Sequence, residues 1–138
     1  MWIRIVLLAA LVCLGRPVPI ASQQINNPEI AIHNMIDSGI FDGHDEKLIA
    51  GTGDSAAVII TKILAGRDLT ARQIDNTLAV LNMAFGSESN GPDAEPRTAL
   101  FILRELDLST NDAQLRARIA QTRKYIQEEF SKSAGGTR

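Results

Sequence analysis

Two histidines and several carboxylates near the start of the chain have the clearest capacity for chemistry. His33 and Asp37 are four residues apart, which would place them on one face of a helix, and His44 follows in a segment rich in acidic side chains. Two imidazoles and a carboxylate can bind Zn²⁺ or act as general acid and base. We therefore consider His33, Asp37 and His44 candidate metal ligands, and a small metal-dependent enzyme is one hypothesis, although their spacing matches no H-E-x-x-H motif.

Ser55 is a second candidate for catalysis, because it follows Gly53 and Asp54 after an apolar run. This Gly-Asp-Ser segment resembles the nucleophile block of the GDSL-type hydrolases. That family places its histidine near the C-terminus in an Asp-x-x-His motif, whereas His33 and His44 both precede Ser55. The family also needs a parallel sheet, and no segment here alternates long enough to supply strands. The sequence therefore assigns no catalytic residue and no cofactor.

The first 22 residues have the order of a secretory signal. Arg4 precedes ten uninterrupted apolar residues at 5–14, and Pro17 and Pro19 interrupt any helix that follows. Ten apolar residues are too few to cross a bilayer, which takes about 20. We predict that residues 1–22 are a cleaved signal peptide, so that the protein is periplasmic or secreted. It would contact the membrane only if this segment were retained.

Removal of the signal would leave a chain of different composition. The only Cys and the only Trp both lie within residues 1–22. Twelve of the 14 basic residues and all 16 acidic residues would remain, which gives a net charge of −4. The lack of cysteine excludes a disulfide scaffold, a Cys-ligated metal centre and a Cys nucleophile. The acidic balance argues against a nucleic-acid binder.

Capping residues and glycines divide the remainder into five predicted helices, at 28–38, 45–65, 71–85, 96–106 and 110–130. Asn27 can cap the first helix, with Pro28 in the first turn and Gly39 at the stop position. Thr70 and Gln73 have the spacing of a capping box for the third. These signals are local, so they place the ends of the helices without reference to the rest of the fold.

Apolar residues three and four apart mark one face of each helix for burial. The residues concerned are Ile32, Met35 and Ile36, then Ile74, Leu78, Leu81 and Phe85, then Ala99, Ile102, Leu103 and Leu106, and finally Leu115, Ile119, Ile126 and Phe130. Segment 56–60 is apolar on all sides and is expected to be buried between other helices. With no strand pattern, we predict an all-α compact bundle of about five helices as a single domain, 23–130, and a disordered tail, 131–138.

Short connections at 66–69 and 107–109 predict two antiparallel helix hairpins. In architecture, though without a sequence repeat, such pairs resemble the stacked hairpins of HEAT-type solenoids. We expect Ser109 to cap the last helix, with Asp112 in its first turn. We also expect Asp112 to pair with Arg116 one helical turn further on.

Four residues are candidates for binding a partner. Arg116 and Arg123 share a face of the last predicted helix, Tyr125 is the aromatic residue expected to be exposed, and Arg97 ends a polar loop, 86–96, that is longer than most helix connections. Because no catalytic set converges, we predict a non-enzymatic helical module, an adaptor, inhibitor or immunity-type protein, whose partner is another protein. A small-molecule carrier with an apolar cavity between the second and third helices is the other alternative.

Overall fold

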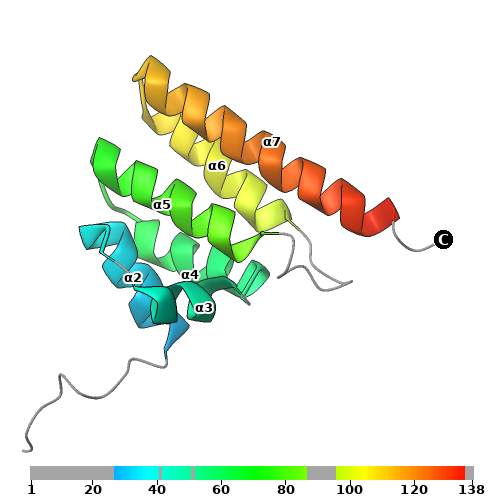
Figure 1. Ribbon diagram of the computed structural model, residues 1–138. Coiled ribbons are helices and arrows are strands. Elements are labelled where there is room, and N and C mark those ends of the chain that lie inside the picture. The colour runs from blue at the N-terminus through cyan, green and yellow to red at the C-terminus, as the bar shows by residue number, and fades with distance from the viewer. Residues whose placement is uncertain (1–26, 41, 51, 87–95, 136–138) are drawn as a thin grey trace, which may run out of the picture.

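The structure, a computed structural model, describes residues 27–40, 42–50, 52–86 and 96–135 (Figure 1). In these residues the chain is helical, without strands, which confirms the predicted all-α bundle. The helices are α2 (Pro28–Ser38), α3 (Gly43–Ala50), α4 (Asp54–Leu64), α5 (Ala71–Ala84), α6 (Arg97–Ser109) and α7 (Ala113–Gly135). The predicted signal and most of the predicted loop 86–96 lie outside the described residues.

The predicted caps of α2 and α5 are confirmed. The side chain of Asn27 accepts a hydrogen bond from the backbone N–H of Glu29 at 2.9 Å, and Gly39 ends α2 in the left-handed conformation with φ of 70°. Thr70 and Gln73 form the reciprocal capping box of α5. Each cap satisfies backbone groups that a helix end leaves without a partner.

The single helix predicted at 45–65 is wrong, because this segment forms two helices, α3 and α4. Gly53, buried between them, has φ of +44°, a conformation that residues with a side chain rarely adopt. The hydroxyl of Thr52 donates to the carbonyl oxygen of Ile49 at 2.6 Å and closes the last turn of α3. The backbone therefore changes direction at the glycine, within the polar and glycine-rich stretch 51–55 that separates the apolar residues of α3 from those of α4.

The predicted cap of α7 is also wrong. Oδ1 of Asp112 accepts hydrogen bonds from the backbone N–H groups of Gln114 at 2.8 Å and Leu115 at 3.1 Å, so Asp112 caps the helix. Ser109 is the last residue of α6, and its hydroxyl donates to the carbonyl oxygen of Leu106 at 2.9 Å. Asp112 is thus committed to the backbone.

The last helix continues to Gly135, beyond residue 130, at which we placed the end of the domain. Two local contacts support these added turns. The hydroxyl of Ser131 donates to the carbonyl oxygen of Gln127 at 2.8 Å, and Nζ of Lys132 lies 2.7 Å from a carboxylate oxygen of Glu129. The predicted disordered tail is therefore helical as far as residue 135, and residues 136–138 lie outside the description.

Two antiparallel hairpins, α4 with α5 and α6 with α7, stack side by side, as the short connections predict (Figure 1). Helix α4 packs on α6 and α5 packs on α7, while α2 and α3 cover the other side of α5. Helix α5 therefore lies at the centre of the molecule, with α7 along one flank. Arg118 contacts Asp75 and Thr122 contacts Asn82, so residue number rises in the same direction along both helices and α5 and α7 run parallel.

One hydrophobic core joins the helices, and most of the predicted faces are buried in it. Ile32, Ile36, Leu81, Leu103 and Ile119 are all fully shielded from solvent. Segment 56–60 is not buried on all sides as expected, since Val58 is 47% exposed. Helix α4 has neighbours on one side only at this position, and its opposite side faces solvent.

Candidate functional site

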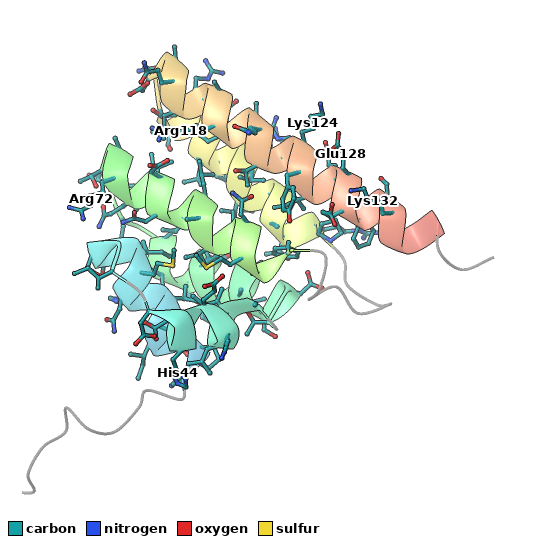
Figure 2. All side chains as sticks on the ribbon, viewed as in Figure 1. His44, Arg72, Arg118, Lys124, Glu128 and Lys132 are labelled. Carbon is teal, nitrogen blue, oxygen red and sulfur yellow. The ribbon has the colours of Figure 1, made fainter. Side chains whose placement is uncertain are left out.

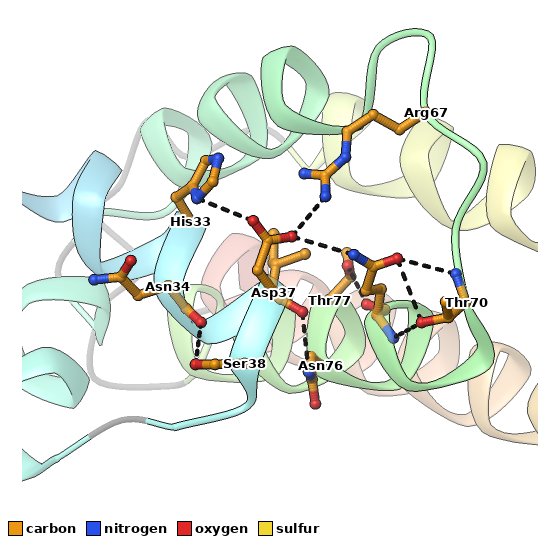
Figure 3. A network of polar contacts seen from close by, with 10 residues as sticks. His33, Asn34, Asp37, Ser38, Arg67, Thr70, Asn76 and Thr77 are labelled. Atoms are coloured by element: carbon orange, nitrogen blue, oxygen red, sulfur yellow. Dashed lines mark hydrogen bonds and ion pairs between the residues drawn. The ribbon is translucent and has the colours of Figure 1, made fainter.

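Asp37, a candidate metal ligand, lies at the centre of a polar network at the end of α2 (Figure 3). Its Oδ2 lies 3.2 Å from Nδ1 of His33, and its Oδ1 accepts hydrogen bonds from Arg67 at 2.6 Å and Gln73 at 3.2 Å. The hydrogen bond from the Arg67 guanidinium lowers the pKa of Asp37 below its ordinary value of 3.8. Both carboxylate oxygens therefore already have partners.

Gln73 links this network to the start of α5. Its Oε1 accepts a hydrogen bond from the backbone N–H of Thr70 at 3.0 Å, while its amide nitrogen donates to Asp37. Two other side chains of α5 donate hydrogen bonds to backbone carbonyl oxygens at the end of α2. One accepting oxygen belongs to Ser38 and the other to Ile36. The capping box of one helix and the C-terminal end of another thus form one joint. Its contacts serve the packing of α2 on α5.

His44 is not part of this network. It lies on α3, at the edge of the molecule farthest from α7 in Figure 2. In the described parts of the chain, no three His, Cys, Asp or Glu side chains are close enough together to hold a metal ion. The structure therefore brings His33 and Asp37 together and leaves His44 apart. Ser55 lies in the first turn of α4, after a helix rather than a strand.

Arg116 and Arg123 lie on the side of α7 that faces α6. Nε of Arg116 is 3.0 Å from Oδ1 of Asp107, and its Nη2 is 3.3 Å from Oδ2, a two-pronged pair between the helices. The hydrogen bond from Arg116 lowers the pKa of Asp107, and Arg123 adds a smaller electrostatic contribution in the same direction. The basic face that we expected to dock a partner is therefore partly neutralised within the protein.

The other two candidate partner-binding residues lie at different places. Arg97 is exposed in the first turn of α6, and the loop before it, 87–95, lies outside the described residues. Tyr125 is 37% exposed, as expected, and its hydroxyl lies near Gly86 at the end of α5. Tyr125 lines a concave surface together with side chains of α5.

That surface is a groove of about 480 Å³ between α5 and α7. Leu78 and Ala79 of α5 give it an apolar floor, and hydrogen-bonding side chains form most of its walls. These are Asp75, Asn76, Asn82, Arg118, Gln121, Thr122 and Tyr125. On each helix the lining residues recur at intervals of three or four, so they lie on one face of that helix. We call this surface the α5–α7 groove.

Two contacts cross the α5–α7 groove and hold its walls together. Nη1 of Arg118 lies 2.9 Å from Oδ1 of Asp75, and both side chains remain about half exposed. Further along, the amide nitrogen of Asn82 donates to the hydroxyl of Thr122 at 3.4 Å, a long hydrogen bond. Neither contact uses Gln121, which is exposed. Hydrogen-bonding capacity therefore remains for a ligand.

Sequence inspection found Tyr125 but missed the rest of the α5–α7 groove. Asp75 and Arg118 are 43 residues apart and Asn82 and Thr122 are 40 apart. Each looks like an ordinary polar position on an amphipathic helix. The one available signal was that polar residues on the two helices recur at matching intervals, which has meaning only once the helices are known to be neighbours.

Comparisons with known protein families, with curated proteins and with solved structures find no match to this chain. Within the described residues, no helix combines the length and the apolar character needed to span a membrane. The class of protein is therefore defined by its fold and its groove alone. It is a stack of helical hairpins with a polar groove between parallel helices.

Proposed function

We propose that this protein is an exported, non-enzymatic interaction module that binds a segment of another protein in the α5–α7 groove. The observation that carries the proposal is the groove itself, whose walls expose hydrogen-bonding groups beyond those that the fold uses. Carboxamides and phenols both donate and accept hydrogen bonds, as do the groups of a peptide backbone. An extended segment could therefore be held through its main chain, with the apolar floor receiving one side chain.

The chemistry of the groove favours binding over catalysis. Among its described lining residues Asp75 is the one carboxylate, and that carboxylate is paired with Arg118. The described lining residues include no His, Cys or Lys that could act as a base or nucleophile. The residues with the best acid–base chemistry, His33 and Asp37, belong to the joint between α2 and α5 instead.

Position-specific photocrosslinking in the producing cells tests the proposal. A photoreactive phenylalanine analogue is placed at Gln121, inside the groove, or at Lys124, which faces away from α5 (Figure 2). Lys124 is a matched control, because it lies on the same helix and is 77% exposed. We expect a discrete protein adduct from position 121 and none from 124.

A second variant links the adduct to the groove. Asn82→Arg places a long side chain on the opposite wall and should abolish the adduct at Gln121 while the far-UV circular dichroism spectrum stays the same. Equal labelling from Gln121 and Lys124, or no adduct at Gln121, would contradict the proposal. A small-molecule carrier would instead show ligand-dependent thermal stabilisation without a protein adduct.

Export is part of the same proposal and rests on the order of charges and apolar residues in 1–22. N-terminal sequencing of the protein from the envelope or medium should begin near Ser22 or Gln23. An intact Met1 in that fraction would show that the segment is retained, and the protein would then be an anchored one.

A further inference from the structure

Helix α6 carries an apolar stripe on the side that faces solvent. Phe101 is 56% exposed and Leu108 is 69% exposed. They are seven residues apart, close to two helical turns, so their side chains point in nearly the same direction. Among the described helices, α6 is the one with two large exposed hydrophobic residues. This stripe lies opposite the buried face formed by Ala99, Ile102, Leu103 and Leu106.

Two opposite charges flank the stripe. Arg104 and Glu105 are both exposed, and at about 100° per residue they fall on opposite sides of the line from Phe101 to Leu108. Adjacent residues of a helix do not face each other, so the two cannot pair well within one chain. Neither forms a side-chain ion pair with another described residue. The stripe is thus basic along one edge and acidic along the other.

We infer that two copies of this chain associate through α6, with the two helices parallel about a two-fold axis. This axis places the basic edge of each α6 helix against the acidic edge of the other. Arg104 of each copy then faces Glu105 of the other, and the stripes of Phe101 and Leu108 meet in the centre. An antiparallel pair would instead set like charges against each other. The charge pattern therefore selects both the partner and its orientation.

The apolar surface continues from α6 onto α4, which enlarges the contact. A groove of about 330 Å³ lies between these helices, and its walls include Leu64, Leu69 and Phe101. Val58, also exposed, lies about one turn of α4 before Thr61 of the groove wall. One helix face and this groove form a small interface, so we expect a weak, concentration-dependent dimer. The α5–α7 groove lies between other helices and stays open in this arrangement.

Sedimentation equilibrium of the processed protein, purified from cells that express the full chain, tests the inference. We expect a monomer–dimer equilibrium, weakened by about tenfold in Arg104→Glu or Glu105→Arg, because each single change sets like charges against each other. The double variant R104E/E105R recreates both pairs and should restore dimerisation. Ile40→Ser serves as the control, since Ile40 is 75% exposed but lies after α2.

A monomer at all concentrations would overturn the inference, and so would a double variant that dimerises no better than the single ones. Orientation is tested separately with Leu108→Cys, since the chain after residue 22 has no other cysteine. In a parallel pair the two introduced thiols lie close enough for a disulfide, so this variant should crosslink on mild oxidation. An equivalent Ile40→Cys variant should stay monomeric, and failure of Leu108→Cys to crosslink would refute the parallel arrangement.

Discussion

Gly39 and Gly66 have nearly the same left-handed backbone conformation, with φ of 70° and 69°, in different surroundings. A Cβ added at Gly66 would meet no atom within 4 Å, whereas one at Gly39 would lie 3.1 Å from Oδ1 and 3.2 Å from Nδ2 of Asn76. That Nδ2 donates a hydrogen bond of 3.0 Å to the carbonyl oxygen of Ile36. Alanine at Gly39 must therefore displace a side chain that holds the end of α2.

A comparison of Gly39→Ala with Gly66→Ala separates the cost of backbone strain from the cost of displacing the Asn76 side chain. Alanine in the left-handed region destabilises the folded state by roughly 1–2 kcal/mol. Alanine also lowers the entropy of the unfolded chain relative to glycine, which stabilises the protein by about 0.4–1 kcal/mol. Gly66→Ala should therefore lower the free energy of unfolding by about 1 kcal/mol. Gly39→Ala should lower it by about 2 kcal/mol, because weakening the hydrogen bond from Asn76 adds about 1 kcal/mol.

Urea denaturation followed by far-UV circular dichroism measures both values. A double-mutant cycle isolates the part due to Asn76. In an Asn76→Ala background nothing remains to be displaced, so Gly39→Ala should cost no more than Gly66→Ala does. Equal costs for the two glycine substitutions in the unmodified protein would refute the reasoning. So would a cost at Gly39 that is unchanged by Asn76→Ala.

The remaining predictions concern charge, capping and metal content. The hydrogen bond from Arg67 lowers the pKa of Asp37 in the folded protein. As the pH falls, Asp37 is therefore protonated in the unfolded chain before it is protonated in the folded one. The resulting stability is present above about pH 4 and is lost as the pH falls through the folded-state pKa. Arg67→Met should flatten this part of the curve of unfolding free energy against pH. Asp112→Ala should destabilise the protein by about 1 kcal/mol in urea and Ser109→Ala by less, because Asp112 caps α7; equal losses would contradict that assignment. Untagged protein should contain no stoichiometric zinc by elemental analysis, since both oxygens of Asp37 have partners; one zinc per chain that His33→Ala removes would restore the enzyme hypothesis.

Local signals account for the parts of the fold that sequence reasoning predicted. The cap at Asn27 and the capping box of Thr70 and Gln73 involve atoms within three residues of each other, so spacing alone specifies them. The buried faces also follow from spacing, because a helix turns by a constant angle per residue. Ser109 failed as a cap because Asp112, three residues later, offers a carboxylate to the same helix start.

Contacts between distant segments account for what was missed. Arg116 had an acidic residue four positions earlier, yet it pairs with Asp107 on α6, because the turn between α6 and α7 brings that carboxylate within reach. Gln73 had an obvious local role and acquired a second, the hydrogen bond to Asp37 across 36 residues. Spacing along one helix cannot report which side chain of another helix lies opposite.

By itself the sequence determined that the described chain is helical, where α2 and α5 begin, and which face of α2, α5, α6 and α7 is buried. These properties depend on neighbours within one or two turns. Only the tertiary structure decided that α5 and α7 lie side by side with the groove between them, that Asp37 belongs to a structural joint, and that Phe101 and Leu108 remain exposed. Those outcomes depend on how the hairpins stack. Apolar helix faces can pack in several nearly equivalent ways, and the packing of the whole core determines which of them forms.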